Sequence, residues 1–135
     1  MDENKQNDKK CILAIDDTAF VLRRITDDLG AYYDVVTANS GMRALKYLEK
    51  NKPDLILLDI QMPNLDGFQV LQLIHAMEGR ADIPVIKLTG SENNESVMKS
   101  VEMGIRDYVL KPFSTSDLLE RIKRALEPRE SASES

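Results

Sequence analysis

Short runs of apolar residues alternate along the chain with segments in which apolar residues recur every three or four positions. The five runs are Cys11–Ile15, Tyr33–Ala38, Leu55–Leu58, Val85–Leu88 and Tyr108–Leu110. Three of them are nearly continuous, which is typical of parallel strands that helices cover on both faces. Stripes of helical period follow the runs, within residues 21–29, 44–48, 68–74, 97–101 and 118–126. This alternation predicts an α/β sandwich with a parallel sheet and right-handed crossovers.

Small polar residues and glycines mark the ends of the predicted helices. Ser40 is a suitable N-cap for the second helix, and Ser114 with Asp117 resembles a capping box at the start of the last one. Gly30 and Gly104 follow two apolar stripes, where the end of a helix favours a positive φ.

Length, composition and charge restrict the classes of protein to which the chain can belong. Its 135 residues suffice for one domain, which we expect at residues 10–127 between disordered tails at 1–9 and 128–135. It has neither a secretory signal nor an apolar run near the roughly 20 residues that span a bilayer, so we expect a cytoplasmic protein that binds no membrane. The net charge of -5 and the absence of a basic stripe argue against nucleic-acid binding by this domain. Cys11, the only cysteine, excludes an internal disulfide and is expected to be a small buried hydrophobe.

Charged and hydroxyl side chains follow several predicted strands at the point where each strand ends. Asp16 and Asp17 follow the first strand, Asp59 the third, Thr89 the fourth and Lys111 the fifth. In an open parallel sheet, ligands bind at the carboxyl ends of the strands. An acid at such a buried edge is costly to desolvate unless a cation meets it. The pattern therefore predicts one chemical site at this edge, although each residue alone also has an ordinary role as a cap, turn or core residue.

Four motifs at these strand ends resemble those of the response-regulator receiver domain, the CheY-like phosphoacceptor of two-component signalling. They are Ile15-Asp16-Asp17, the segment Leu58–Gly67, Leu88-Thr89-Gly90 and the segment Asp107–Phe113. The resemblance covers roughly Lys10 to Glu127. It implies a doubly wound (βα)5 three-layer sandwich whose five parallel strands take the flavodoxin-like order 2-1-3-4-5.

The resemblance also implies a role for each acid and for the lysine. Asp59 is the nucleophile that accepts the phosphoryl group, and Lys111 neutralises charge on the transferring oxygens. Asp17, Asp59 and the backbone carbonyl of Gln61 bind Mg²⁺ directly, and Asp16 acts mostly through water; Mn²⁺ is an alternative ion. A hard divalent cation also relieves the repulsion between crowded carboxylates.

A switch and a readout surface follow from the same resemblance. Thr89 and Tyr108 form the switch pair, and Gly90 lets the backbone approach the phosphate closely. The readout surface comprises the fourth helix, the fifth strand and the fifth helix. The Lys111-Pro112 peptide bond is expected to be cis.

Three further positions affect the site in ways that the sequence leaves open. Gln61 and Ser91 stand two residues beyond Asp59 and Thr89, where the family tunes the lifetime of the phosphoryl group. Lys87 lies inside the fourth strand, where the family usually has an apolar residue. We expect Lys87 either to extend its ammonium to solvent or to pair with an acid.

The expected function is that of a phosphoacceptor rather than an enzyme, with at most slow self-catalysed phosphorylation and dephosphorylation. A sensor histidine kinase or a histidine phosphotransfer protein would supply the phosphoryl group, and a protein target would read the surface. The receiver is either a stand-alone protein or part of a longer regulator, and a monomer or a dimer favoured by phosphorylation.

An interaction-only pseudo-receiver would lack the acids or the lysine. An aspartyl-phosphate phosphohydrolase would usually have an acid at Gln61, and a flavin-binding protein would need a phosphate loop where Asp16 and Asp17 stand.

Overall fold

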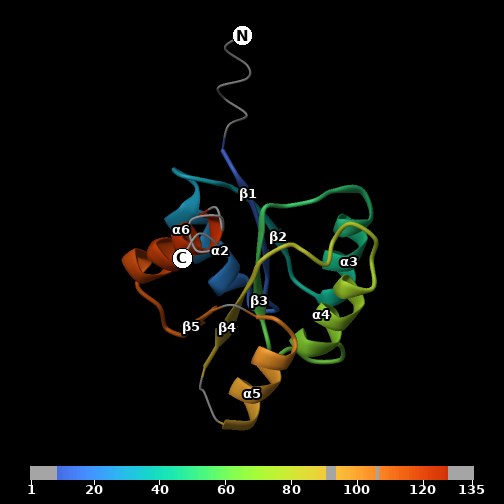
Figure 1. Ribbon diagram of the computed structural model, residues 1–135. Helices are drawn as coiled ribbons and strands as arrows, with labels where there is room; N and C mark the ends of the chain where they lie inside the picture. The colour runs from blue at the N-terminus through green and yellow to red at the C-terminus, as the bar shows by residue number, and fades with distance from the viewer. Residues whose placement is uncertain (1–8, 91–93, 106, 128–135) are drawn as a thin grey trace, which may run out of the picture.

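A five-stranded parallel sheet forms the centre of the molecule (Figure 1). The computed structural model describes residues 9–90, 94–105 and 107–127, except the side chains of residues 94–97. The strands are β1 (Cys11–Ile15), β2 (Asp34–Ala38), β3 (Leu55–Asp59), β4 (Val85–Thr89) and β5 (Asp107–Leu110). They lie in the order β2-β1-β3-β4-β5, which confirms the predicted topology. The two predicted tails lie outside the described residues, apart from Lys9.

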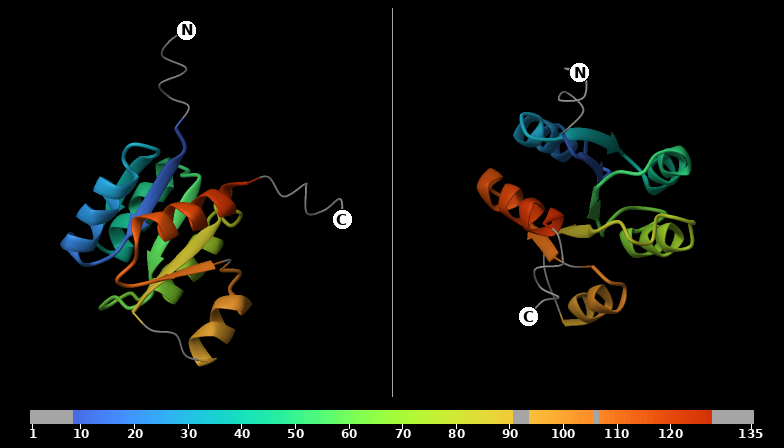
Figure 2. Two further views of the ribbon diagram at one scale, coloured as in Figure 1. Left: turned by 90° about the vertical axis from the view of Figure 1, so that its left-hand side faces the viewer. Right: turned by 45° about the horizontal axis from the view of Figure 1, so that its top comes forward.

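Helices cover both faces of the sheet, which gives three layers (Figure 2). The helices are α2 (Ala19–Leu29), α3 (Gly41–Lys50), α4 (Gly67–His75), α5 (Asn94–Glu102) and α6 (Thr115–Leu126). Buried side chains of α2 and α6 pack on one face, and those of α3 and α4 pack on the other. Helix α5 lies beside β4 and β5 at one end of the sheet. Every predicted strand and helix is therefore present in the predicted order.

Two apolar cores, one on each side of the sheet, hold the layers together. Every residue of β3 is buried, because this strand is central and covered on both faces. Alternate β3 residues belong to opposite cores: Ile56 and Leu58 face α3 and α4, whereas Leu55 and Leu57 face α2 and α6. The continuous apolar runs of the sequence thus reflect strands buried on both faces.

The predicted N-caps are confirmed. Ser40 Oγ accepts a hydrogen bond from the Arg43 N–H at 3.2 Å, and Ser114 Oγ accepts one from the Asp117 N–H at 3.1 Å. The Asp117 side chain forms an ion pair with Arg121 at 3.1 Å, one turn further along α6. A reciprocal capping box occurs instead at the start of α4, between Asp66 and Gln69.

The prediction of a positive φ is confirmed for Gly104 and wrong for Gly30. Gly104 has a φ of 79°, whereas Gly30 keeps a helical φ of -61°. The chain keeps turning in the helical sense after α2, because the N–H groups of Tyr32 and Tyr33 both donate to the Leu29 carbonyl at 2.9 Å. No left-handed residue is needed where the helix unwinds gradually in this way.

Several apolar side chains lie at the surface. Met98 and Val101 of α5 are exposed. Part of the apolar stripe that predicted this helix therefore faces solvent instead of the core. Cys11 is only half-buried, and its Sγ lies 3.6 Å from the Tyr47 hydroxyl. Among the helices within the described ranges, none combines the length and the apolar character needed to cross a bilayer.

Candidate functional site

Three carboxylates meet at the carboxyl ends of β1 and β3. Asp16 directly follows β1 and is fully buried, Asp17 is exposed, and Asp59 ends β3 with 3% of its surface exposed. One carboxylate oxygen from each residue lies within 4.8 Å of the others. Because β1 and β3 are hydrogen-bonded neighbours, their ends bring together acids that are more than 40 positions apart. We refer to Asp16, Asp17 and Asp59 as the acid trio.

Lys111 reaches the acid trio from the end of β5. Its Nζ lies 2.8 Å from Asp16 Oδ2 and 3.6 Å from Asp59 Oδ1. The Lys111-Pro112 peptide bond is cis, as predicted, and the Lys111 N–H donates to the Thr89 carbonyl at 2.8 Å. The sequence predicted a cation for Asp59, and the structure places this cation closer to Asp16.

Backbone N–H groups hold one oxygen of each buried carboxylate. Asp16 Oδ1 accepts from the Thr18 N–H at 2.8 Å, and Asp59 Oδ1 accepts from the Gln61 N–H at 3.1 Å. The second oxygen of Asp16 faces Lys111 at an ion-pair distance but in a geometry that makes no hydrogen bond. These bonds orient the carboxylates and leave oxygen lone pairs in the crevice.

The environment of Asp59 disfavours its ionised form. Burial and the neighbouring Asp16 carboxylate are the main causes, and together with Asp17 they raise the pKa of Asp59 to about 6. Lys111 and the Gln61 N–H act in the opposite direction on this pKa and offset only part of the increase. The bare site is therefore short of positive charge, and a further cation would favour the ionised carboxylate.

The acid trio has the composition of a site for a hard divalent cation. Its ligand atoms are carboxylate oxygens, which Mg²⁺, Mn²⁺ and Ca²⁺ prefer to nitrogen or sulfur. The excess of negative charge in a buried crevice and the incompletely hydrogen-bonded Asp16 Oδ2 both favour such an ion. The trio could thus hold a metal, while the part of the Gln61 carbonyl in binding it stays a prediction.

Thr89, the predicted switch residue, ends β4 beside the crevice and is buried. Tyr108 is 39% exposed and lies opposite Lys87 in the register of β4 and β5. Its ring centre lies 5.9 Å from Lys87 Nζ and 5.6 Å from the Arg121 guanidinium carbon. The ring of this edge strand is therefore close to two cations.

Lys87 is buried, with 2% of its surface exposed, so it does not extend to solvent. Its ammonium donates a hydrogen bond to Ser100 Oγ of α5 at 2.6 Å. Sequence reasoning had no signal for Ser100, because its role depends on how α5 packs against β4. This contact links β4, two residues before Thr89, to α5.

Gly67, at the start of α4, closes the second motif, but the sequence did not indicate how closely it approaches the end of β3. A Cβ at this position would lie 2.5 Å from the Asp59 carbonyl oxygen and 2.6 Å from the Ile60 Cα. Only a glycine lets the helix begin so close to the backbone of the acid trio. The remaining predicted positions differ: among the described residues none lies within 4 Å of a Cβ built at Gly90, the Gln61 side chain is exposed, and Ser91 lies outside the described residues.

Comparison with known families gives one match that covers most of the chain. Residues 12–123 match the response regulator receiver domain. The probable transcriptional regulator ycf27 of Porphyridium aerugineum is 36% identical over 126 residues, which are 93% of this chain and 51% of that protein. The alkaline phosphatase synthesis transcriptional regulatory protein PhoP of Bacillus subtilis is 35% identical over 93% of this chain and 52% of its own length. The chain thus spans about half the length of these relatives.

Solved structures show the same fold over nearly their whole length. Chemotaxis protein CheY4 of Vibrio cholerae has a TM-score of 0.84 at 28% identity, covering 87% of this chain and 99% of that one. The receiver domain of sensor histidine kinase PA1611 from Pseudomonas aeruginosa, with a magnesium ion coordinated in its active site cleft, has a TM-score of 0.80 at 28% identity. It covers 87% of this chain and 98% of its own. These neighbours have the architecture described above.

Proposed function

The chain belongs to the response regulator receiver domain family, and we propose that Asp59 is its phosphoacceptor. The phosphoryl group would come from a phosphohistidine of a sensor histidine kinase or a histidine phosphotransfer protein. The observation that carries the proposal is the position of Asp59, a buried carboxylate at the end of β3 with Lys111 3.6 Å away. Attack by one of its oxygens on phosphorus forms an aspartyl phosphate, and the bond from phosphorus to the donor nitrogen breaks.

Lys111 acts as the fixed positive charge of the site. Its ammonium lies between Asp16 and Asp59, where it meets the oxygens of a phosphoryl group carried by Asp59. Transfer of a phosphoryl group depends mainly on positioning and on neutralising its oxygens. Asp16 holds Lys111 in this place through the shorter ion pair.

Asp16, Asp17 and Asp59 would hold Mg²⁺, with the backbone carbonyl of Gln61 as a further ligand. When bound, the ion neutralises negative charge on the carboxylates and on the transferring phosphoryl oxygens. The magnesium ion in the PA1611 receiver domain supports this assignment by similarity of fold. The ion would also lower the raised pKa of Asp59 and so favour the ionised carboxylate that acts as the nucleophile.

The output of phosphorylation would be a change in the surface formed by α5, β5 and α6. Thr89 would donate its hydroxyl to a phosphoryl oxygen, and Tyr108 would move inward as Thr89 moves. Exposed apolar side chains already lie on this surface, among them Met98, Val101 and Leu110. A protein partner or a second copy of the chain would bind there, and the phosphoryl group would shift an equilibrium between two states.

Incubation with acetyl phosphate and Mg²⁺ tests the proposal. We expect intact-protein mass spectrometry to show the addition of one phosphoryl group to the wild-type chain and none to Asp59→Asn. Asp27→Asn, which changes an exposed acid of α2, is the matched control and should be labelled like the wild type. Equal labelling of the Asp59→Asn variant would overturn the assignment.

A further inference from the structure

Arg24 of α2 contacts the loop between β5 and α6, residues 111–114. Its Nη2 donates a hydrogen bond to the Phe113 carbonyl, and its guanidinium carbon lies 4.8 Å from the centre of the Phe113 ring. The two residues stand 89 positions apart in the sequence. One side chain thus holds both the backbone and the ring of the same loop residue.

An acid of α2 holds the Arg24 side chain in turn. Asp28 stands one turn further along the helix, and its Oδ2 lies 3.5 Å from Arg24 Nε. This oxygen is buried and has no hydrogen bond within the described part of the chain, so the guanidinium is the positive charge that meets it. Because Nε faces Asp28 and Nη2 faces Phe113, the planar guanidinium is oriented from two directions.

The contact with Phe113 is made two residues after Lys111. The Lys111 N–H donates to the Thr89 carbonyl at 2.8 Å, which fixes the start of the loop beside the end of β4. Pro112 has no N–H and cannot donate a second backbone hydrogen bond. Phe113 then fixes the loop again, because its buried ring packs in the core of α2 and α6 and its carbonyl accepts from Arg24. The backbone of Lys111 therefore lies between two fixed points.

The reach of Lys111 depends on where its backbone lies. Its Nζ is 2.8 Å from Asp16 Oδ2 and 3.6 Å from Asp59 Oδ1. A lysine side chain is a flexible four-carbon stem, so the ammonium is placed by the start of that stem and by its ion pairs. If Phe113 were released, the shorter ion pair would keep the ammonium at Asp16 and its distance from Asp59 would no longer be fixed.

We propose that Arg24 is a positioning residue for phosphoryl transfer: it holds Phe113, and through this residue it keeps Lys111 within reach of a phosphoryl group on Asp59. The inference rests on the proposed function of Lys111. Arg24 acts through the loop and not by contact with the reacting atoms.

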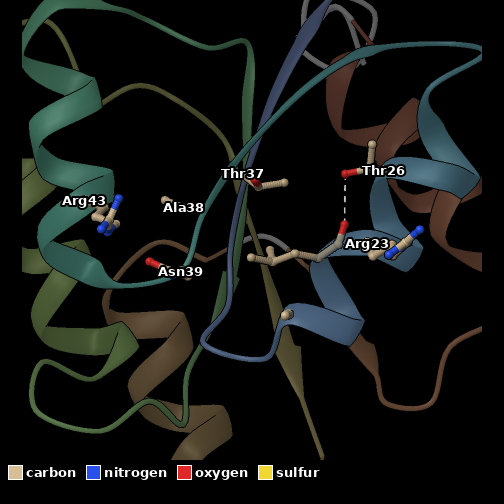
Figure 3. Close-up of a pocket in the computed structure, with 8 residues that line it drawn as sticks. Arg23, Thr26, Thr37, Ala38, Asn39 and Arg43 are labelled. Carbon is tan, nitrogen blue, oxygen red and sulfur yellow. Dashed lines mark hydrogen bonds between the residues drawn. The ribbon is translucent and has the colours of Figure 1, made fainter.

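Arg23 provides a matched control on the same helix. Successive residues of an α-helix point about 100° apart around its axis, so the two arginines project in different directions. Arg23 is exposed and lines a hollow of about 420 Å³ between α2, β2 and α3 (Figure 3), whereas Arg24 contacts the loop after β5. Arg23→Gln removes the same charge as Arg24→Gln without touching that contact.

Relaxation of ¹⁵N nuclei in the metal-free protein tests whether Arg24 holds the loop. In Arg24→Gln we expect the order parameters of the Lys111 and Phe113 N–H groups to fall from about 0.85, typical of rigid backbone, towards about 0.6. In Arg23→Gln they should match the wild type. Unchanged order parameters in Arg24→Gln would overturn the proposal.

A kinetic double-mutant cycle tests whether Arg24 acts through Lys111. The rate of phosphoryl addition from acetyl phosphate with Mg²⁺ is followed by intact-protein mass spectrometry. We expect Arg24→Gln to slow this rate about tenfold when Lys111 is present, since a misplacement of about 1 Å can cost roughly a hundredfold. In the Lys111→Ala background Arg24→Gln should have no further effect. Equal slowing in both backgrounds would overturn the proposal, because Arg24 would then act independently of Lys111.

The same cycle separates failure of this inference from failure of the proposed function. If Lys111→Ala is labelled as fast as the wild type, the proposed role of Lys111 fails and the inference fails with it. If Lys111→Ala is slow while Arg24→Gln keeps the wild-type rate, the inference alone fails. The Arg24 side chain is 36% exposed, so Arg24→Gln should fold. Arg24→Lys, which keeps the charge and one donor, is the milder variant for the same two measurements.

Discussion

The ammonium of Lys87, in the centre of β4, donates a buried hydrogen bond to the hydroxyl of Ser100 on α5 at 2.6 Å. A buried lysine is costly to desolvate, and its hydrogen bonds recover part of that cost. The contact joins the strand that ends in Thr89 to a helix of the proposed output surface. Lys87 also lies 5.9 Å from the centre of the Tyr108 ring, so both residues of the expected switch pair have Lys87 as a near neighbour.

A double-mutant cycle over Lys87→Met and Ser100→Ala measures this link. We expect a coupling free energy of about 1.5–3 kcal/mol in urea unfolding, the range for a hydrogen bond to a charged group. Hydrogen exchange of the α5 amides should accelerate in Lys87→Met, while that of the α2 amides stays unchanged. Lys46→Met provides the control for loss of an exposed cation, with no effect on α5. A coupling near zero would show that the two side chains act independently.

The pKa of Asp59 makes the stability of the metal-free protein depend on pH. This pKa is raised from an ordinary value of 3.8 to about 6, so between these values the folded state binds more protons than the unfolded state. The free energy of unfolding therefore falls as pH rises through this window. The increase corresponds to about 3 kcal/mol lost above pH 6.

Asp59→Asn should remove that loss. In EDTA we expect the variant to exceed the wild type in free energy of unfolding by up to about 3 kcal/mol at pH 8, with the difference shrinking towards pH 4. Urea unfolding at both pH values gives the measurement, and Asp27→Asn should show no such dependence on pH. A gain of the same size at pH 4 would mean that the ionisation of Asp59 is not its cause.

Mg²⁺ should stabilise the folded protein through the acid trio. An ion that binds only the folded state adds about 2.7 kcal/mol at a hundredfold excess over its dissociation constant, or roughly 10 °C in melting temperature. Asp17→Asn should abolish most of this gain, since Asp17 is exposed and its carboxylate is free to serve as a ligand. Asp27→Asn should retain it in the same thermal melts. A melting temperature indifferent to Mg²⁺ would contradict the metal site.

The sequence predicted the parts of this protein that depend on local pattern. Continuous apolar runs predicted strands such as β3. Once a parallel sheet was inferred, the acids at the strand ends predicted the position of the acid trio. The strand order came from resemblance to a family, since the apolar pattern does not distinguish one order from another.

The parts that the sequence missed depend on tertiary contacts. Lys111 lies closer to Asp16 than to Asp59 because of where the loop after β5 places its ammonium. Ser100 stands 13 residues from Lys87, and only the packing of α5 on β4 brings them together. Gly30 was expected to have a positive φ at the end of its helix, but the backbone after α2 unwinds without a left-handed residue.

Gly67→Ala should destabilise the protein even though alanine is the better helix former. Alanine is favoured over glycine by about 1 kcal/mol within a helix. Its Cβ would, however, lie 2.5 Å from the Asp59 carbonyl oxygen, a backbone atom that cannot turn aside like a flexible side chain. Overpacking of this kind typically costs about 1–3 kcal/mol, so we expect a net loss of that order in urea unfolding. Because the clash displaces the end of β3, Mg²⁺ affinity should fall as well. Gly90→Ala is the matched control: its Cβ would meet no atom of the described residues within 4 Å, and we expect a change of at most about 0.5 kcal/mol. Equal stability of the two variants would show that the start of α4 can move away from the acid trio at little cost.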